Sequence, residues 1–142
     1  MKHIAGILIM ASIALFTACD KASINGNLDG MWHLVRIDSI GGGSNNVAHE
    51  LRYLSFQLHL AEVRSTQGIS GTYLLRFSHT EDSLSFIECY DPTNSLDTLV
   101  ADASVLSPYG ISHLPATFHI DHLTRLSLIL RSQSLRLNFE KR

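Results

Sequence analysis

The chain has 142 residues, with 11 Lys and Arg residues against 13 Asp and Glu residues, and 45% of its residues are hydrophobic. This length is enough for one domain with a real hydrophobic core. The formal net charge of −2 lacks the excess of positive charge that nucleic-acid-binding proteins carry. We therefore expect a single domain with no nucleic-acid partner.

The N-terminus has the layout of a secretion signal. Lys2 precedes an uncharged, largely apolar run over residues 4–18. A helix needs about 20 apolar residues to cross a bilayer, so this run is short for a permanent transmembrane helix. A positive charge, a short apolar run and small residues at its end predict a signal peptide over residues 1–18.

The apolar run ends in Phe16-Thr17-Ala18-Cys19, and Asp20 follows. This sequence resembles the lipobox of bacterial lipoproteins, where a peptidase cuts before a lipid-modified cysteine. The resemblance implies that Cys19 carries acyl chains such as palmitate and anchors the chain to a membrane of the cell envelope. Two or three acyl chains hold a protein essentially permanently. We expect the outer membrane and leave the leaflet open. An ordinary secretory signal that happens to contain a cysteine is the alternative.

Small and polar residues dominate the stretch after the signal. Residues 19–28 predict a lipidated, flexible tether, and residues 29–142 then form the folded domain. Cys89 is the only other cysteine, so acylation of Cys19 leaves no partner for an intrachain disulfide. Because Cys89 lies in an apolar stretch, we expect a buried structural thiol rather than a nucleophile.

After the tether, hydrophobic residues recur with a period of two, which is typical of half-buried β-strands. Turn-forming residues separate these stretches, among them a Gly-rich loop at 41–46 and the two-residue link 132–133. In chain order, the predicted strands cover residues 31–38, 54–60, 73–77, 83–90, 116–122, 126–131 and 135–140.

One segment does not alternate. Around residues 95–107 the apolar residues follow helical spacing, and Pro108 and Gly110 stop the pattern. We expect a short helix or irregular segment that covers one end of the sheet.

The predicted architecture is all-β, with seven or eight antiparallel strands. Each strand has one apolar face that must be buried. Closing the sheet into a barrel buries that face and leaves no exposed edge. A sandwich of two sheets is the alternative that the pattern leaves open.

The first predicted strand opens with Gly30-Met31-Trp32, which resembles the Gly-x-Trp opening of the lipocalin superfamily. The C-terminal half, including residues 135–141, resembles small lipocalin-like lipoproteins of gut-type anaerobic Gram-negative bacteria. The resemblance covers residues 28–142 and implies a lipocalin-like β-barrel that binds an apolar ligand. The chain is shorter than a typical lipocalin, however, so its own side chains could fill the barrel.

The resemblance also assigns a packing role at one end of the barrel. In lipocalins the glycine starts the first strand, and a basic side chain covers the tryptophan. Lys141 continues the inward row of the last predicted strand, so we expect Lys141 to stack on Trp32 beside Gly30. A surface lysine near a frayed terminus is the alternative.

The sequence contains no pattern that favours an enzyme. His119 and His122 lie three residues apart on a predicted strand, so they point to opposite faces and cannot chelate one metal ion. His119 and Asp121 do share a face, but a third ligand would have to come from another strand. Hydrolase, metalloprotease and phosphate-loop motifs are absent from the sequence. We therefore expect no metal, no cofactor and no catalytic activity.

The leading hypothesis is a non-catalytic, membrane-anchored module that binds a small apolar ligand inside the barrel. The alternative is an envelope protein with a filled barrel that binds an unidentified protein partner. The volume of the interior separates the two. The expected ligand-lining residues are Leu54, Phe56, Leu58, Tyr73, Leu75, Phe77, Leu126 and Leu128.

Overall fold

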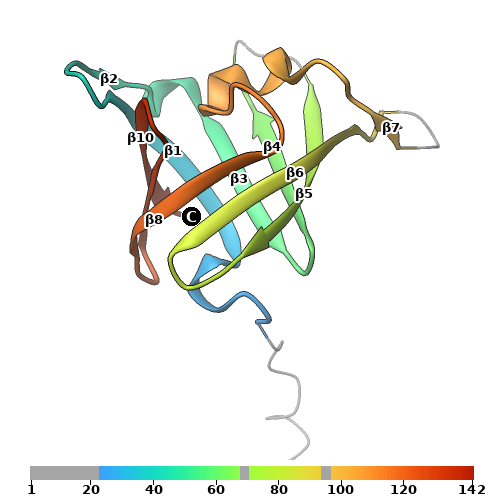
Figure 1. Ribbon diagram of the computed structural model, residues 1–142, viewed down its shortest axis with the longest axis horizontal. Helices are drawn as coiled ribbons and strands as arrows, with labels where there is room; N and C mark the ends of the chain where they lie inside the picture. The colour runs from blue at the N-terminus through green and yellow to red at the C-terminus, as the bar shows by residue number, and fades with distance from the viewer. Residues whose placement is uncertain (1–22, 68–70, 94–96) are drawn as a thin grey trace, which may run out of the picture.

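The computed structural model describes residues 23–67, 71–93 and 97–142, which form a closed antiparallel β-barrel (Figure 1). Cys19 and the predicted signal peptide lie outside the described residues. The strands of the barrel are β1 (Gly30–Ser39), β3 (Arg52–Gln57), β4 (Leu60–Ser65), β5 (Thr72–His79), β6 (Ser83–Asp91), β8 (Ala116–Leu123), β9 (Ser127–Arg131) and β10 (Leu135–Lys141).

Pairing between the first and last strands closes the barrel. Neighbouring strands follow the order β10-β9-β8-β6-β5-β4-β3-β1, and β1 pairs again with β10. In that last ladder Trp32 lies opposite Lys141. The closed sheet decides between the two architectures that the sequence left open, because a sandwich would leave β1 and β10 as unpaired edges.

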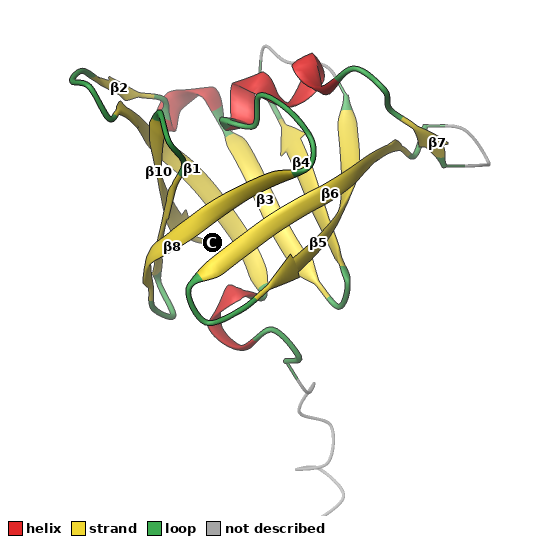
Figure 2. Cartoon of the chain, in the orientation of Figure 1, coloured by secondary structure: helices red, strands yellow, loops and turns green. Residues whose placement is uncertain are grey.

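Two short strands and three short 3-10 helices complete the described fold (Figure 2). The strand β2 (Ser44–Asn46) pairs with β1, and β7 (Thr98–Leu99) pairs with β6. The helices are η1 (Gly26–Leu28), η2 (Ala48–Glu50) and η3 (Ala103–Tyr109).

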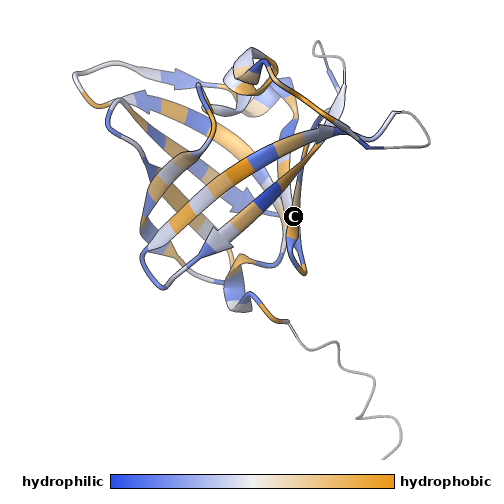
Figure 3. Cartoon of the chain, turned by 45° about the vertical axis from the view of Figure 1, so that its right-hand side comes forward, coloured by the Kyte–Doolittle hydropathy of each residue, from blue (hydrophilic) through white to orange (hydrophobic). Residues whose placement is uncertain are grey.

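The predicted alternation places one face of each strand inside the barrel. Along β8, for example, Ala116, Phe118 and Ile120 are buried, whereas Thr117 and His119 between them are exposed. Hydrophobic and hydrophilic residues therefore alternate along the ribbons (Figure 3). The period-two pattern is sufficient for this result because successive side chains of a strand point to opposite faces.

The predicted strand at 54–60 ends at Gln57 in the structure, and the strand β4, which the sequence analysis did not predict, begins at Leu60. The chain turns at Leu58 and His59, and Gln57 pairs with Leu60 across the resulting β3–β4 hairpin. Leu58 has a φ of 54°, in the left-handed region where Gly and Asn are the usual residues. No turn signal marks this position in the sequence, because an apolar residue occupies the turn and continues the hydrophobic alternation.

The helix expected around 95–107 forms later than the spacing indicated. Residues 98–99 are the strand β7, and η3 covers Ala103–Tyr109 with Pro108 inside it. Asp102 caps η3 by accepting a 2.9 Å hydrogen bond from the backbone N–H of Ser104. Residues 94–96, where the expected helix would begin, lie outside the described part.

The barrel has two different ends. The turns β3–β4, β5–β6 and β8–β9, together with η1 and the C-terminus, form what we call the tether end, where the described chain begins (Figure 1). The opposite, mouth end consists of η2, η3 and the β9–β10 turn. The strand directions require this arrangement, because alternate connections of an antiparallel barrel lie at the same end.

Candidate functional site

Inward-facing side chains occupy the interior of the barrel. The most deeply buried large side chains include Trp32, Phe56, Phe86 and Phe118, each no more than 2% exposed. A cavity large enough for a small ligand would expose the side chains around it. Exposed fractions this close to zero therefore show that these four side chains do not border such a cavity.

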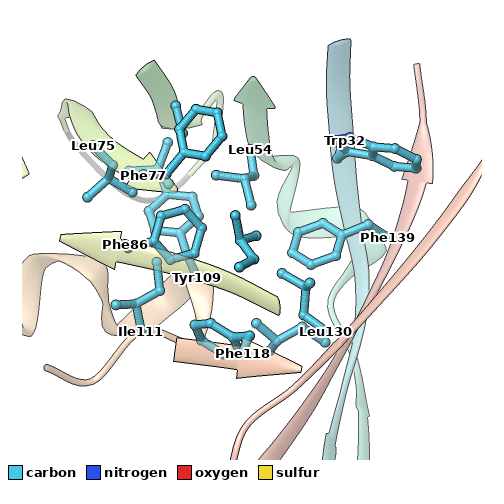
Figure 4. Close-up of a cluster of buried hydrophobic side chains, with 14 of the residues drawn as sticks. Trp32, Leu54, Leu75, Phe77, Phe86, Tyr109, Ile111, Phe118, Leu130 and Phe139 are labelled. Atoms are coloured by element: carbon cyan, nitrogen blue, oxygen red, sulfur yellow. The ribbon is translucent and has the colours of Figure 1, made fainter. Parts of the chain in front are cut away.

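Aromatic side chains contact one another across this core (Figure 4). The ring centroids of Phe56 and Phe77 lie 5.0 Å apart in an edge-to-face arrangement, and those of Phe56 and Phe86 lie 6.3 Å apart. Phe118 packs edge-on against Phe86 at 6.0 Å. These distances are typical of packed aromatic pairs, so a ligand could enter the interior only by displacing the rings.

Six of the eight predicted lining residues lie at or near this core. Leu54, Phe56, Leu75, Phe77 and Leu128 are buried in it, and Tyr73 is half-buried against it. The ligand-binding role assigned to these residues stays a prediction.

The sequence placed Leu58 and Leu126 inside the barrel, and the structure shows that this was wrong. The side chains are 58% and 62% exposed. Leu58 lies in the turn that separates β3 from β4, and Leu126 precedes the first residue of β9. Residues in turns are outside the pleat of the sheet, so the alternation that assigns inner and outer faces no longer applies to them.

At the tether end, Trp32 and Lys141 pack together. The Lys141 Nζ lies 4.3 Å from the centroid of the buried Trp32 ring, within the range of a cation–π contact. Trp32 Nε1 donates a 2.8 Å hydrogen bond to the carbonyl oxygen of Leu28. Lys141 Nζ also donates to the carbonyl oxygens of Asn27 and Asp29. These contacts fasten η1 over the end of the barrel.

Gly30 leaves the space that Lys141 occupies. Its φ is +114°, and a Cβ atom at this position would lie 3.1 Å from Lys141 Nζ. A larger residue would therefore be strained and would also push the ammonium group away from Trp32. Gly30, Trp32 and Lys141 form one packing unit in the structure.

A second set of polar contacts at this end involves residues that the sequence analysis did not select. The Asp29 carboxylate accepts hydrogen bonds from Asn25 Nδ2 at 2.6 Å and from Ser23 Oγ at 2.8 Å. Burial alone would raise the pKa of Asp29, but these hydrogen bonds outweigh it and lower the pKa. Asn25 also contacts His79 Nε2 at 3.1 Å. Residues 25–28 of the predicted tether thus pack against the barrel.

The mouth end is closed by apolar side chains. Leu106, Tyr109 and Ile111 are no more than 3% exposed and cover the interior from above. Burial is the main reason why the pKa of Tyr109 rises to about 12, so its phenol remains neutral. The Arg52 Nη1 donates a 2.8 Å hydrogen bond to the carbonyl oxygen of Pro108 and so links η3 to the barrel wall.

Beside this closure lies a groove of about 660 Å³, bounded by the chain that links η3 to β8 and by the β9–β10 turn. Its accessible lining includes the apolar residues Pro115 and Leu135 and polar residues such as Ser112 and Gln133. Ile111 and Phe118 also border the groove, but their side chains are no more than 2% exposed. The sequence did not predict this groove, because residues 107–118 and 132–135 meet only when the barrel closes. We call it the mouth groove.

His119 is exposed on the outer face of β8, and Cys89 is buried in the core. His119 Nδ1 lies 2.7 Å from Asp121, whose carboxylate also binds Arg131 and lies 3.6 Å from Arg136. The described residues hold no group of three His, Cys, Asp or Glu side chains that could bind a metal ion. Burial, with a smaller contribution from Asp91, raises the pKa of the Cys89 thiol to about 11. The thiol therefore stays protonated at neutral pH.

None of the helices in the described part of the chain has the length and hydropathy needed to cross a bilayer.

Comparison with known proteins identifies the architecture independently. A family model described as a lipocalin-like domain matches residues 14–142. The fold is similar to that of a lipocalin-like protein from Bacteroides uniformis, with a TM-score of 0.63 and 21% identity over 82% of this chain and 100% of that one. An uncharacterized protein from Bacteroides eggerthii gives a TM-score of 0.59 and 17% identity over 81% and 99%. No curated protein matches the chain.

Proposed function

The chain belongs to the lipocalin-like domain family, and on that premise we propose that it is a non-catalytic binding module held at the cell envelope by lipid on Cys19. The lipobox resemblance of Phe16-Thr17-Ala18-Cys19 supports the anchor. Metabolic labelling with a palmitate analogue tests it. The wild-type chain should incorporate the label and the Cys19→Ala variant should not.

The mouth groove is the best-supported ligand site. Its volume of about 660 Å³ falls within the range of about 300–1,000 Å³ that is usual for small-molecule sites. The hydrophobic core side chains that the structure describes, by contrast, are no more than 9% exposed. We therefore place the ligand at the rim of the barrel rather than inside it.

The lining of the groove defines the chemical class of the ligand. Pro115 and Leu135 offer accessible apolar surface, whereas Ser112 and Gln133 offer hydrogen-bonding groups. This arrangement suits a small molecule with an apolar body and at least one polar group.

Native mass spectrometry of residues 20–142 tests this site. The purified protein should carry a bound small molecule, and the Ser112→Trp variant should lose it because the indole occupies the groove. Ser78→Trp is the matched control, because Ser78 is also an exposed serine but lies on β5, outside the groove. Equal binding by both variants would exclude the mouth groove as the site.

The filled interior also favours a second candidate function, an envelope protein that binds a protein partner. This function predicts no small-molecule adduct in the wild-type spectrum. It also predicts that affinity purification from crosslinked cells recovers one envelope protein in a fixed ratio to this chain. A small-molecule adduct that only Ser112→Trp removes would argue against it.

A further inference from the structure

Exposed aliphatic side chains gather at the tether end of the barrel. Ile24 is 50% exposed, Leu58 58%, Leu60 44% and Leu126 62%. Leu58 and Leu126 belong to the β3–β4 and β8–β9 turns, and Ile24 directly precedes the residues that pack against the barrel. The ribbon shows these turns at the end where the described chain begins (Figure 1).

Two grooves continue this apolar surface on either side of the β3–β4 hairpin. One has a volume of about 470 Å³ and includes Gly30, Phe56 and Leu58 in its lining. The other has about 520 Å³ and is lined in part by Leu58, Leu60 and Leu74. The exposed leucines thus extend into a broader apolar area than their own side chains provide.

The length of the chain before Ser23 limits how far this end can be from the membrane. Ser23 is held against the η1 segment, because its Oγ lies 2.9 Å from Gly26 O and 2.8 Å from the Asp29 carboxylate, and its hydroxyl can donate to either acceptor. Only four residue steps separate Ser23 from Cys19, and a fully extended chain spans at most about 3.6 Å per step. An acylated Cys19 therefore holds Ser23 within about 14 Å of the bilayer surface.

We propose that the tether end docks on the bilayer, with Ile24, Leu58, Leu60 and Leu126 entering the region between headgroups and acyl chains. This inference rests on the lipid anchor proposed above. The short connection brings these side chains to the interface, and the bilayer removes their apolar surface from water. Docking also fixes the orientation of the domain, because the mouth groove then faces away from the membrane.

The distribution of charged residues at this end favours a barrel that is tilted relative to the membrane surface. Arg125 adjoins Leu126 in the β8–β9 turn, so its guanidinium can reach lipid phosphates while the leucine inserts. Glu81 and Asp82 lie in the β5–β6 turn, and carboxylates are repelled by anionic lipids. The β3–β4 and β8–β9 turns should therefore insert more deeply than the β5–β6 turn.

The test places a tryptophan at each end of the barrel and measures its contact with lipid. The mature chain, residues 19–142, contains every described element of the barrel. Its Cys19 is coupled to a maleimide-bearing phosphatidylethanolamine, whereas the buried Cys89 should not react. The coupled protein is reconstituted into vesicles of phosphatidylethanolamine and phosphatidylglycerol that contain lipids with brominated acyl chains, which quench tryptophan fluorescence.

Leu58→Trp and Leu126→Trp report on the tether end, and Ile40→Trp and Leu99→Trp are the matched controls at the mouth end. Ile40 N–H donates to Ser134 O in the β9–β10 turn, and Leu99 on β7 pairs with Tyr90 near the end of β6. The four positions are similarly exposed, at 48% to 62%. Trp32 is common to all four variants, and the wild-type chain supplies its background signal. The proposal predicts that bromine quenches the tether-end tryptophans about threefold or more above the mouth-end tryptophans.

Equal quenching at both ends, or quenching at the mouth end alone, would overturn the proposal. The exposed apolar surface at the tether end would then be expected to bind another protein or a second copy of this chain. Chemical coupling makes this result independent of lipidation in the cell. A negative palmitate-labelling result would therefore reject the proposed anchor, whereas unselective quenching of the coupled protein would reject the docking surface.

Discussion

At the tether end, polar contacts hold the single turn of η1 against Trp32, whereas at the mouth end the apolar side chains of η3 fill the opening. The first closure depends on charged and hydrogen-bonding groups near the proposed membrane surface. The second depends on shape and burial, beside the groove proposed as the ligand site. The difference indicates that the two ends of one barrel can respond separately to substitution and to pH.

The largest effect should come from Gly110→Ala at the mouth end. Gly110 has a φ of +82°, and a Cβ atom there would lie only 2.4 Å from Leu137 Cδ2 in the packed interior. We expect a loss of about 2–3 kcal/mol in the free energy of unfolding, from backbone strain together with overpacking. Denaturant unfolding measures this loss.

Gly43→Ala is the matched control for Gly110→Ala. Its φ is +95°, but no atom lies within 4 Å of the added Cβ, so it reports the backbone strain alone. We expect a smaller loss of about 1 kcal/mol. Equal losses for the two variants would show that η3 does not close the mouth by tight packing on Leu137.

A smaller effect should follow from Lys141→Met at the tether end. The substitution keeps a flexible apolar stem but removes the ammonium group from Trp32 and from the carbonyl oxygens of Asn27 and Asp29. We expect a loss of about 1–2 kcal/mol in the free energy of unfolding, together with a change in Trp32 fluorescence.

The control for Lys141→Met is Arg136→Met on the same strand. Arg136 is exposed, and its guanidinium lies 3.6 Å from Asp121 in a surface ion pair. Exposed ion pairs contribute little, so the loss should stay within about 0.5 kcal/mol and leave Trp32 fluorescence unchanged. If the two variants lost equal stability, the tether end would not depend on the Lys141 contacts.

The smallest effect should come from Asp29→Asn at the tether end, which should change how the free energy of unfolding depends on pH. Hydrogen bonds hold the pKa of Asp29 below its ordinary value despite the opposing effect of burial. The folded state therefore gains stability from this carboxylate above its unfolded pKa and loses it as the pH falls through the folded pKa. Between pH 6 and pH 3, Asp29→Asn should lose less stability than the wild-type chain in urea titrations.

Asp102→Asn gives the corresponding measurement at the mouth end. A hydrogen bond from the Ser104 N–H lowers the pKa of this exposed cap residue as well. Asp102 has fewer hydrogen-bond partners than Asp29. Its substitution should therefore reduce the pH dependence of the free energy of unfolding by a smaller amount. An equal reduction of the pH dependence by Asp102→Asn and Asp29→Asn would show that the two ends do not differ in their response to acid.

Hydrophobic periodicity predicted most of the fold because each barrel strand has one face toward the core. The strands β8 and β10 lie where their alternation predicts, and Trp32 and Lys141 face each other because both rows continue inward. The β3–β4 turn escaped prediction, since Leu58 breaks the strand without interrupting its apolar pattern. The mouth groove could not be predicted for another reason, because its walls come from segments that become neighbours only when the sheet closes.

The sequence by itself determined the all-β class, the inward rows of every barrel strand except β4, and the family to which the Gly30-Met31-Trp32 opening points. These features are local, because a strand's two faces differ in polarity wherever the strand lies. The tertiary structure alone decided that the core side chains are almost fully buried, and that the turns carrying the exposed Leu58 and Leu126 lie at the end where the described chain begins. Both depend on how distant segments pack, and no periodicity along the chain records the space left between them.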